Sequence, residues 1–175
     1  MPSMALPDVP TAVGADELVA MLHRQHYRDL VRLAGLLLHD VGASEEVVQD
    51  AFVQLHLRWR ELRDPARGAA WLRSAVLNGA RSRLRHLEVR SRHRRPAHAN
   101  AESAEDVALS GDARAGVLRA IDTLPTRQRE AVVLRYYLDL SEADMAAAMG
   151  ISAGSVKTHL HRALAALHVQ IEGAP

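Results

Sequence analysis

Apolar residues recur every three or four positions along most of this chain, and that spacing is typical of amphipathic helices. In the first such segment, residues 15–39, the repeating residues are Leu18, Leu22, Leu30, Leu33 and Leu37. The sequence is 48% hydrophobic but only 3% aromatic, so a core must consist mainly of leucine, valine and alanine. Such a core favours packed helices over sheets, and no strand pattern exceeds four residues. The sequence therefore predicts an all-α fold.

Two further helices are expected in the first half of the chain. Gly42 ends the first pattern, and Ser44 is expected to N-cap a second helix over 44–62, with acidic residues in its first turn. After a corner formed by an Asp-Pro pair and a glycine, a third helix is expected over 69–89. Three helices with short connections predict a compact domain.

A second helical domain is predicted after a segment rich in alanine, serine and aspartate. One helix is expected to end at Pro125, and Thr126 is expected to cap a short helix through about Tyr137. The predicted organisation is a disordered tail over 1–14, a helical domain over 15–91, a flexible linker over 92–113 and a second helical domain over 114–172.

Arginine is concentrated in residues 58–95, which carry 12 arginines against Glu61, Asp64 and Glu88, although the formal net charge of the whole chain is +1. Solvated surfaces usually interleave both signs of charge, so a block this basic predicts a surface that binds a polyanion. A merely solvated face is the alternative.

Residues 142–160 fit a helix-turn-helix. Ala146 is small where two helices must approach closely, and Gly150 allows the positive φ of a tight turn. Ser141 is expected to cap the first helix and Ser152 the second.

Successive residues of the second helix are rotated by about 100° around its axis, so its side chains divide between two faces. The face expected to pack inward holds Val156, Leu160, Ala163, Leu164 and Leu167. The opposite face holds Ser155, Thr158, His161 and Arg162, with Lys157 and His159 on its flanks. No acidic residue occurs between positions 150 and 171. Hydroxyls near a helix N-terminus, followed by basic side chains, suit phosphates and base edges, so the pattern favours DNA binding over plain packing and solvation.

Several other classes of function find no support in the sequence. The chain has no cysteine, which excludes disulfides and thiolate metal sites and favours a reducing cytoplasm. Its ten histidines lack metal-ligand spacing, and no catalytic triad, P-loop or dinucleotide fingerprint is present. No signal peptide or apolar run of spanning length is seen. We therefore expect a cytoplasmic protein that has no metal, cofactor or catalytic activity of its own.

Two segments together resemble a known family. SEEVVQDAFVQLHLRW (44–59), followed by AAWLRSAVLNGARSRLR (69–85), resembles region 2 of extracytoplasmic function sigma factors. IDTLPTRQREAVVLRYYLDLSEADMAAAMGISAGSVKTHLHRAL (121–164) resembles their region 4. Two motif sets in the right order are more specific than either one alone.

This resemblance implies a factor that lends promoter specificity to core RNA polymerase. Region 2 would bind the β′ clamp helices and open the −10 element, and region 4 would read the −35 element and touch the β flap. An anti-sigma factor is a further partner of such proteins. The alternatives are a stand-alone helix-turn-helix regulator and a sigma-like helical adaptor that binds only protein partners.

The resemblance also assigns candidate site residues. The −35 contacts would be Arg135, Gly154, Ser155, Lys157, Thr158, His161 and Arg162. The −10 contacts would be Arg63, Arg67, Arg73, Asn78, Arg81 and Arg85. The polymerase-binding face would be Glu46, Gln49, Asp50 and Val53, although that face could equally be solvated.

Departures from the family pattern occur at three histidines, because His56 stands where many relatives have an aromatic residue, and His159 and His161 replace more usual basic or aromatic types. Trp71 could stack on a melted base, but its position favours the core.

Overall fold

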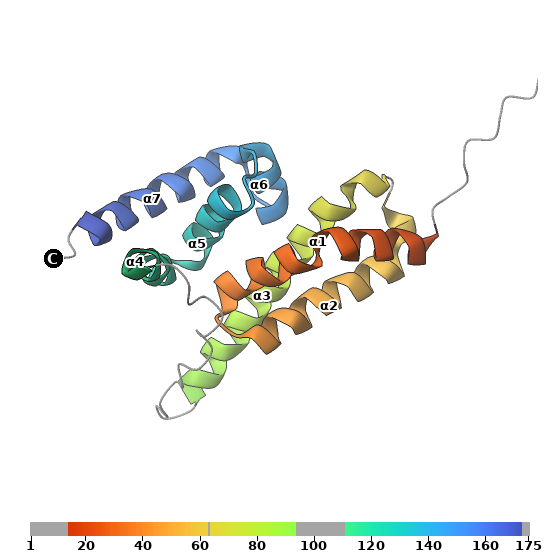
Figure 1. The fold of residues 1–175 in the computed structure, drawn as a ribbon, viewed down its shortest axis with the longest axis horizontal. Coiled ribbons are helices and arrows are strands. Elements are labelled where there is room, and N and C mark those ends of the chain that lie inside the picture. The colour runs from red at the N-terminus through yellow and green to blue at the C-terminus, as the bar shows by residue number, and fades with distance from the viewer. Residues whose placement is uncertain (1–13, 63, 94–110, 173–175) are drawn as a thin grey trace, which may run out of the picture.

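The computed structural model describes residues 14–62, 64–93 and 111–172, and every regular element within these ranges is helical. The all-α fold with two helical units is thereby confirmed (Figure 1). The first unit consists of α1 (Ala15–Leu38), α2 (Val41–Arg58), the short 3-10 helices η1 (Trp59–Glu61) and η2 (Pro65–Arg67), and α3 (Gly68–His93). The second consists of α4 (Gly111–Asp122), α5 (Thr126–Val132), the π-helical turn η4 (Val133–Tyr137), α6 (Glu142–Met149) and α7 (Ala153–Glu172).

The start of α2 differs from the prediction, because Asp40 and not Ser44 caps this helix. Helix α1 ends at Leu38, and its C-cap residue His39 has a left-handed φ of 54° that turns the chain sharply. Asp40 is extended, and its carboxylate accepts a hydrogen bond from the backbone N–H of Ala43 at 2.8 Å. Ser44 is buried within the first turns and donates its hydroxyl to the Asp40 carbonyl at 2.6 Å. The helix therefore starts one turn earlier than the capping pattern suggested.

The predicted cap of α5 was also wrong. Pro125 is the N-cap residue, and Thr126 is already helical. The Pro125 carbonyl accepts from the backbone N–H groups of Gln128 and Arg129 at 2.8 and 3.0 Å, with no side-chain cap. The helical path then runs through η4 to Tyr137, as expected, although its last turn is π-helical.

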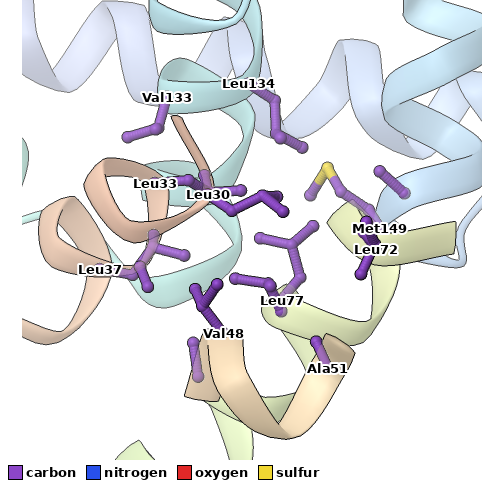
Figure 2. Close-up of a cluster of buried hydrophobic side chains, with 14 of the residues drawn as sticks. Leu30, Leu33, Leu37, Val48, Ala51, Leu72, Leu77, Val133, Leu134 and Met149 are labelled. Atoms are coloured by element: carbon purple, nitrogen blue, oxygen red, sulfur yellow. The ribbon is translucent and has the colours of Figure 1, made fainter. Parts of the chain in front are cut away.

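A single buried cluster joins the two units. In the first unit it includes Leu33 and Leu77, and in the second it includes Leu134 and Met149. All four are at most 1% exposed. Figure 2 shows these side chains converging from both units on one apolar centre. Helix α6 packs on α3, and α5 and η4 pack on α1. The predicted linker overlaps the end of α3 and the start of α4, and its residues 94–110 lie outside the described ranges.

A second, smaller cluster belongs to the C-terminal unit alone. It consists of Ala120, Leu124, Val132, Ala163 and Leu167, from α4, α5 and α7 and the turn between α4 and α5. These contacts hold α7 against its own unit and leave its polar face outside.

Candidate nucleic-acid interface

The helix-turn-helix has the predicted local geometry. Ser141 caps α6, because its hydroxyl accepts from the Asp144 backbone N–H at 3.1 Å. Gly150 ends the helix with a φ of 67°. Ser152 accepts from the backbone N–H of Ser155 at 3.1 Å just before α7. The sequence expectations for all three positions are confirmed.

The inward face of α7 matches the predicted wheel except at Leu164. Val156 and Ala163 are fully buried, and Leu167 is 7% exposed. Leu164 is 40% exposed, because it lies at the edge of the apolar stripe. There Leu164 and other residues of α7 line a shallow depression, and no other described element contributes to its lining. Its assignment to the packing face was therefore wrong.

The outer face of α7 carries the residues predicted to contact the −35 element. Exposed members are Gly154, Lys157, Thr158, His161 and Arg162, while Ser155 is half-buried. Thr158 donates its hydroxyl to the Gly154 carbonyl at 3.0 Å, and Lys157 pairs with Glu142 across the turn at 3.4 Å. Arg135 is exposed and donates to the Leu140 carbonyl at 2.9 Å.

The residues predicted to contact the −10 element do not share one environment. Arg63 lies outside the described residues. Arg67 is largely exposed, with Asp64 at 3.9 Å, and Asn78 and Arg85 are exposed on α3. Arg73 is half-buried, and its Nε atom is buried without a hydrogen-bond partner. Arg81 is largely buried between the two units and is described separately below.

A groove of about 560 Å³ runs between α2 and α3. One wall carries Glu46 and Asp50, and the other carries Asn78 and Arg83. Glu46 and Arg83 pair at 3.3 Å across it. Trp71 packs against the central cluster and also lines this groove, so it has both a core-facing and a groove-facing side.

The outer face of α2 is solvent-exposed at every position predicted to bind polymerase. These positions are Glu46, Gln49, Asp50 and Val53. Val53 is 57% exposed, and Leu57, one turn further on, is 75% exposed. Sequence reasoning missed Leu57, although its i, i+4 spacing from Val53 is a visible signal. The face therefore combines carboxylates with two exposed apolar side chains.

Arg81 and Asn78, both predicted as −10 contacts, belong to a polar cluster where the two units meet, and the sequence analysis missed the partners of Arg81 in that cluster. Glu130 of α5 is fully buried and accepts from Arg81 of α3 through both carboxylate oxygens, at 2.6 and 2.8 Å. Arg81 also donates to the Asn78 side-chain oxygen at 2.8 Å. Arg127 donates to Glu130 at 3.3 Å and to the Met149 carbonyl at 3.0 Å. The signal in the sequence that could have indicated this cluster is Glu130, an acidic residue directly before the apolar run AVVL at 131–134.

A second polar contact lies at the edge of the same junction. Arg129 of α5 donates to the Leu37 carbonyl of α1 at 3.3 Å and to the carbonyls of Asp122 and Leu124. Burial lowers the pKa of the Arg129 guanidinium, and the Asp122 carboxylate offsets part of that effect. His39 Nε2 lies 3.1 Å from the Asp122 carboxylate and 3.2 Å from Arg129. A protonated Nε2 would donate to Asp122, and an unprotonated one would accept from Arg129.

The described residues show neither a cluster of metal-ligating side chains nor a helix suited to span a membrane. They contain no group of three or more histidine, aspartate or glutamate side chains placed to hold a metal ion. None of their helices is both long and apolar enough to cross a membrane.

Family models match both units of this chain. The Sigma-70 region 2 model matches residues 22–90, and the Sigma-70, region 4 model matches residues 114–167. The chain is 34% identical over 143 residues to an RNA polymerase sigma-E factor of Streptomyces coelicolor, which covers 81% of this chain and 79% of that protein. It is 35% identical over 152 residues to the ECF RNA polymerase sigma factor SigM of Mycobacterium tuberculosis, covering 83% and 73% of the two chains.

Solved structures show the same fold. The sigma factor RpoE of Bartonella quintana, in complex with the anti-sigma factor NepR, aligns with a TM-score of 0.70 at 22% identity over 87% of this chain and 96% of that one. CnrH in complex with the cytosolic domain of CnrY aligns with a TM-score of 0.65 at 24% identity over 92% and 96%. With both sigma regions present in order, the chain belongs to the extracytoplasmic function group of sigma-70 family RNA polymerase sigma factors and is an alternative sigma factor that directs transcription.

Proposed function

We propose that this sigma factor divides promoter recognition between its two units, with the outer face of α7 reading the −35 element and α3 engaging the −10 element. The observation that carries the proposal is the acid-free outer face of α7 behind a correctly capped helix-turn-helix turn. A helix held this way presents its N-terminal half to a major groove.

The −35 contacts are chemically suited to duplex DNA. Arg162 can contact a guanine edge with two donors, and the α7 N-terminus favours a phosphate. To contact a phosphate, Lys157 must give up its ion pair with Glu142. The free-energy cost of breaking this pair is small, because both side chains are partly exposed. Phosphate contacts would set the register, and base-edge contacts would select the sequence.

The −10 contacts are suited to a melted strand. Arg85 and Arg67 are exposed and can neutralise phosphates. Asn78 opens onto the groove between α2 and α3, and its amide can both donate to and accept from an extruded base. The half-buried Trp71 at the same groove offers an aromatic edge to that base.

The outer face of α2 is proposed to bind core polymerase. Its exposed carboxylates would steer the encounter with a basic partner, while Val53 and Leu57 would be buried on docking. The β flap is a further proposed contact of the second unit. We include an anti-sigma factor among the partners, because the aligned RpoE structure is a complex with an anti-sigma factor. The protein would act in the cytoplasm with polymerase and would catalyse no reaction itself.

Run-off transcription with core RNA polymerase tests this function. The purified chain should co-elute with core polymerase and start transcripts at a defined position on a promoter selected from genomic DNA. Absence of co-elution would contradict it. Tight, specific duplex binding without polymerase would instead indicate a stand-alone regulator.

Triple charge reversal at Arg81, Arg83 and Arg85 separates the sigma function from that of a helical adaptor. The variant should lose initiation, and an adaptor that binds only proteins would keep its partner binding and activity. Circular dichroism of the variant would check that the fold survives the loss of the Arg81–Glu130 pair.

A further inference from the structure

Lysine occurs only once in this chain, at position 157, although lysine and arginine together number 22. Arginine remains protonated and does not act as a nucleophile, and the chain has no cysteine to compete for an electrophile. Lys157 is therefore the only side chain in the sequence that forms a stable amide with an activated acyl group. Acyl donors thus have a single lysine target.

The amine of Lys157 lies beside the turn between α6 and α7 and is open to solvent. Its side chain is 66% exposed, and Nζ lies 3.4 Å from a carboxylate oxygen of Glu142, whose side chain is 45% exposed. Long side chains of a helix extend over the preceding turn, which here holds the small, exposed residues Ala153 and Gly154. Exposed ion pairs contribute little to stability, so the amine exchanges between Glu142 and solvent. An acyl donor can therefore reach Nζ without a change in the fold.

Acylation of Lys157 would change the charge of the surface proposed to read DNA. Lys157 and Glu142 together carry no net charge, and an amide at Nζ would leave the Glu142 carboxylate without its cation. The first helix of a helix-turn-helix crosses the DNA backbone, and Glu142 begins that helix, α6. The modification would thus remove a phosphate contact and leave a negative charge near the phosphates.

We propose that Lys157 is an acylation site, modified by an acyl phosphate or an acyl thioester, and that its modification weakens binding to the −35 element. The uncharged amine attacks the acyl carbonyl carbon, and an N–C bond forms. The C–O bond of the acyl phosphate or the C–S bond of the thioester breaks, phosphate or thiolate leaves with the electron pair, and the nitrogen loses a proton to water. Nothing is oxidised or reduced. The inference rests on the proposed role of α7 at the −35 element.

The first experiment asks whether Lys157 is modified. The full chain is incubated with acetyl phosphate or, in a parallel sample, with acetyl-coenzyme A, and its peptides are analysed by mass spectrometry. Acetyl-lysine should appear at position 157, and the two samples show which class of donor supplies it. Lys157→Arg is the control, because it leaves only a terminal amine to modify. A Lys157 amine that stays unmodified under conditions that acetylate a reference lysine peptide would overturn the inference.

The second experiment measures the effect on DNA binding. Acetylated and untreated chains are each assembled with untreated core polymerase, and binding to a −35 duplex is followed by fluorescence anisotropy. With one phosphate contact fewer, the affinity should fall by about eightfold at about 0.1 M salt, and the slope of log affinity against log salt should shrink by about 0.9. Lys157→Gln should reproduce this loss without any treatment. Lys157→Arg should show the same affinity before and after treatment.

A double variant separates the loss of charge from the change of shape. Lys157→Gln/Glu142→Gln returns the local charge to zero, so it should recover most of the affinity that Lys157→Gln loses. Absence of this recovery would overturn the charge-based mechanism. Unchanged −35 binding by both the acetylated chain and Lys157→Gln would overturn the inference as a whole. A wild-type holoenzyme that does not distinguish the −35 duplex from a scrambled one would instead contradict the proposed function of α7.

Discussion

At the scale of single residues, Gly150 and Gly154 differ in whether the backbone conformation requires a glycine. Gly150 has a φ of 67°, a conformation that costs a residue with a Cβ about 1 kcal/mol. Gly154 lies in the first turn of α7 with no positive φ, and a Cβ there would meet only Ser152 Oγ at 3.9 Å. The turn between α6 and α7 therefore depends on Gly150 and not on Gly154.

We predict that Gly150→Ala lowers the free energy of unfolding by about 1 kcal/mol. Gly154→Ala should raise it by about 0.5 kcal/mol, because alanine loses less backbone entropy on forming a helix. Urea unfolding followed by circular dichroism measures both values. Equal effects of the two substitutions would contradict the assigned turn geometry.

Arg162 is the side chain on which the orientation of α7 in the groove can best be tested. Arg162→Ala should weaken binding to the −35 element by about 1–3 kcal/mol, because a bidentate base contact is lost. Holoenzyme assembly should persist, since the polymerase-binding candidates lie on α2. Fluorescence anisotropy with −35 duplexes and co-elution with core polymerase measure the two effects.

Arg119→Ala is the control for Arg162, because Arg119 is also an exposed arginine of the same unit but lies on a different helix, α4. It should lower duplex affinity only slightly. Parallel loss of −35 binding and core binding in Arg162→Ala would show that the wrong face of α7 has been assigned.

At the scale of elements, the close crossing of α2 and α3 depends on Gly79. A Cβ at this position would lie 2.8 Å from Val47 Cγ1, which is closer than real contacts allow. Valine is stiff at χ1, so this neighbour cannot move away easily. The crossing also shapes the groove onto which Asn78 opens. Gly79 is therefore needed for both the packing and the form of the groove.

Gly79→Ala should lower the free energy of unfolding by about 1–3 kcal/mol through overpacking. Val47→Ala removes the clash. Adding Gly79→Ala to Val47→Ala should therefore lower the free energy of unfolding by much less than Gly79→Ala does in the wild-type chain. A double-mutant cycle in urea measures the coupling. Strict additivity of the two substitutions would show that the helices separate without strain.

At the scale of the whole molecule, the continuous buried cluster couples the stabilities of the two units. Val133 contributes to the cluster that both units share, and its neighbour Val132 contributes to the cluster of the second unit alone. They are 3% and 4% exposed, respectively. The two valines thus form a matched pair for measuring coupling between units.

Tryptophan fluorescence reports the first unit, because Trp59 and Trp71 are the chain's two tryptophans. Val133→Ala should lower the midpoint of the tryptophan-detected unfolding transition, with a loss of about 1–3 kcal/mol. Val132→Ala should disturb mainly the second unit and move that transition less. Identical shifts would mean that the whole chain unfolds as one unit whichever cluster is altered, and no shift in either would mean that the units unfold independently.

Local patterns predicted much of this protein. Helical spacing indicated the all-α fold, and the residues around Gly150 predicted both caps and the positive φ of the helix-turn-helix, because these features depend on neighbours within a turn. The outer face of α7 followed from the same periodicity. The DNA-binding and polymerase-binding roles of individual residues stay predictions.

Other features were decided by tertiary structure. Asp40 replaced Ser44 as the cap of α2 because the end of α1 fixed where the next helix could begin. Arg81 is 49 positions from Glu130, so no local pattern could pair them. Sequence periodicity determines which face of each helix is apolar, but the partner of a buried charge depends on how the helices of the two units pack together.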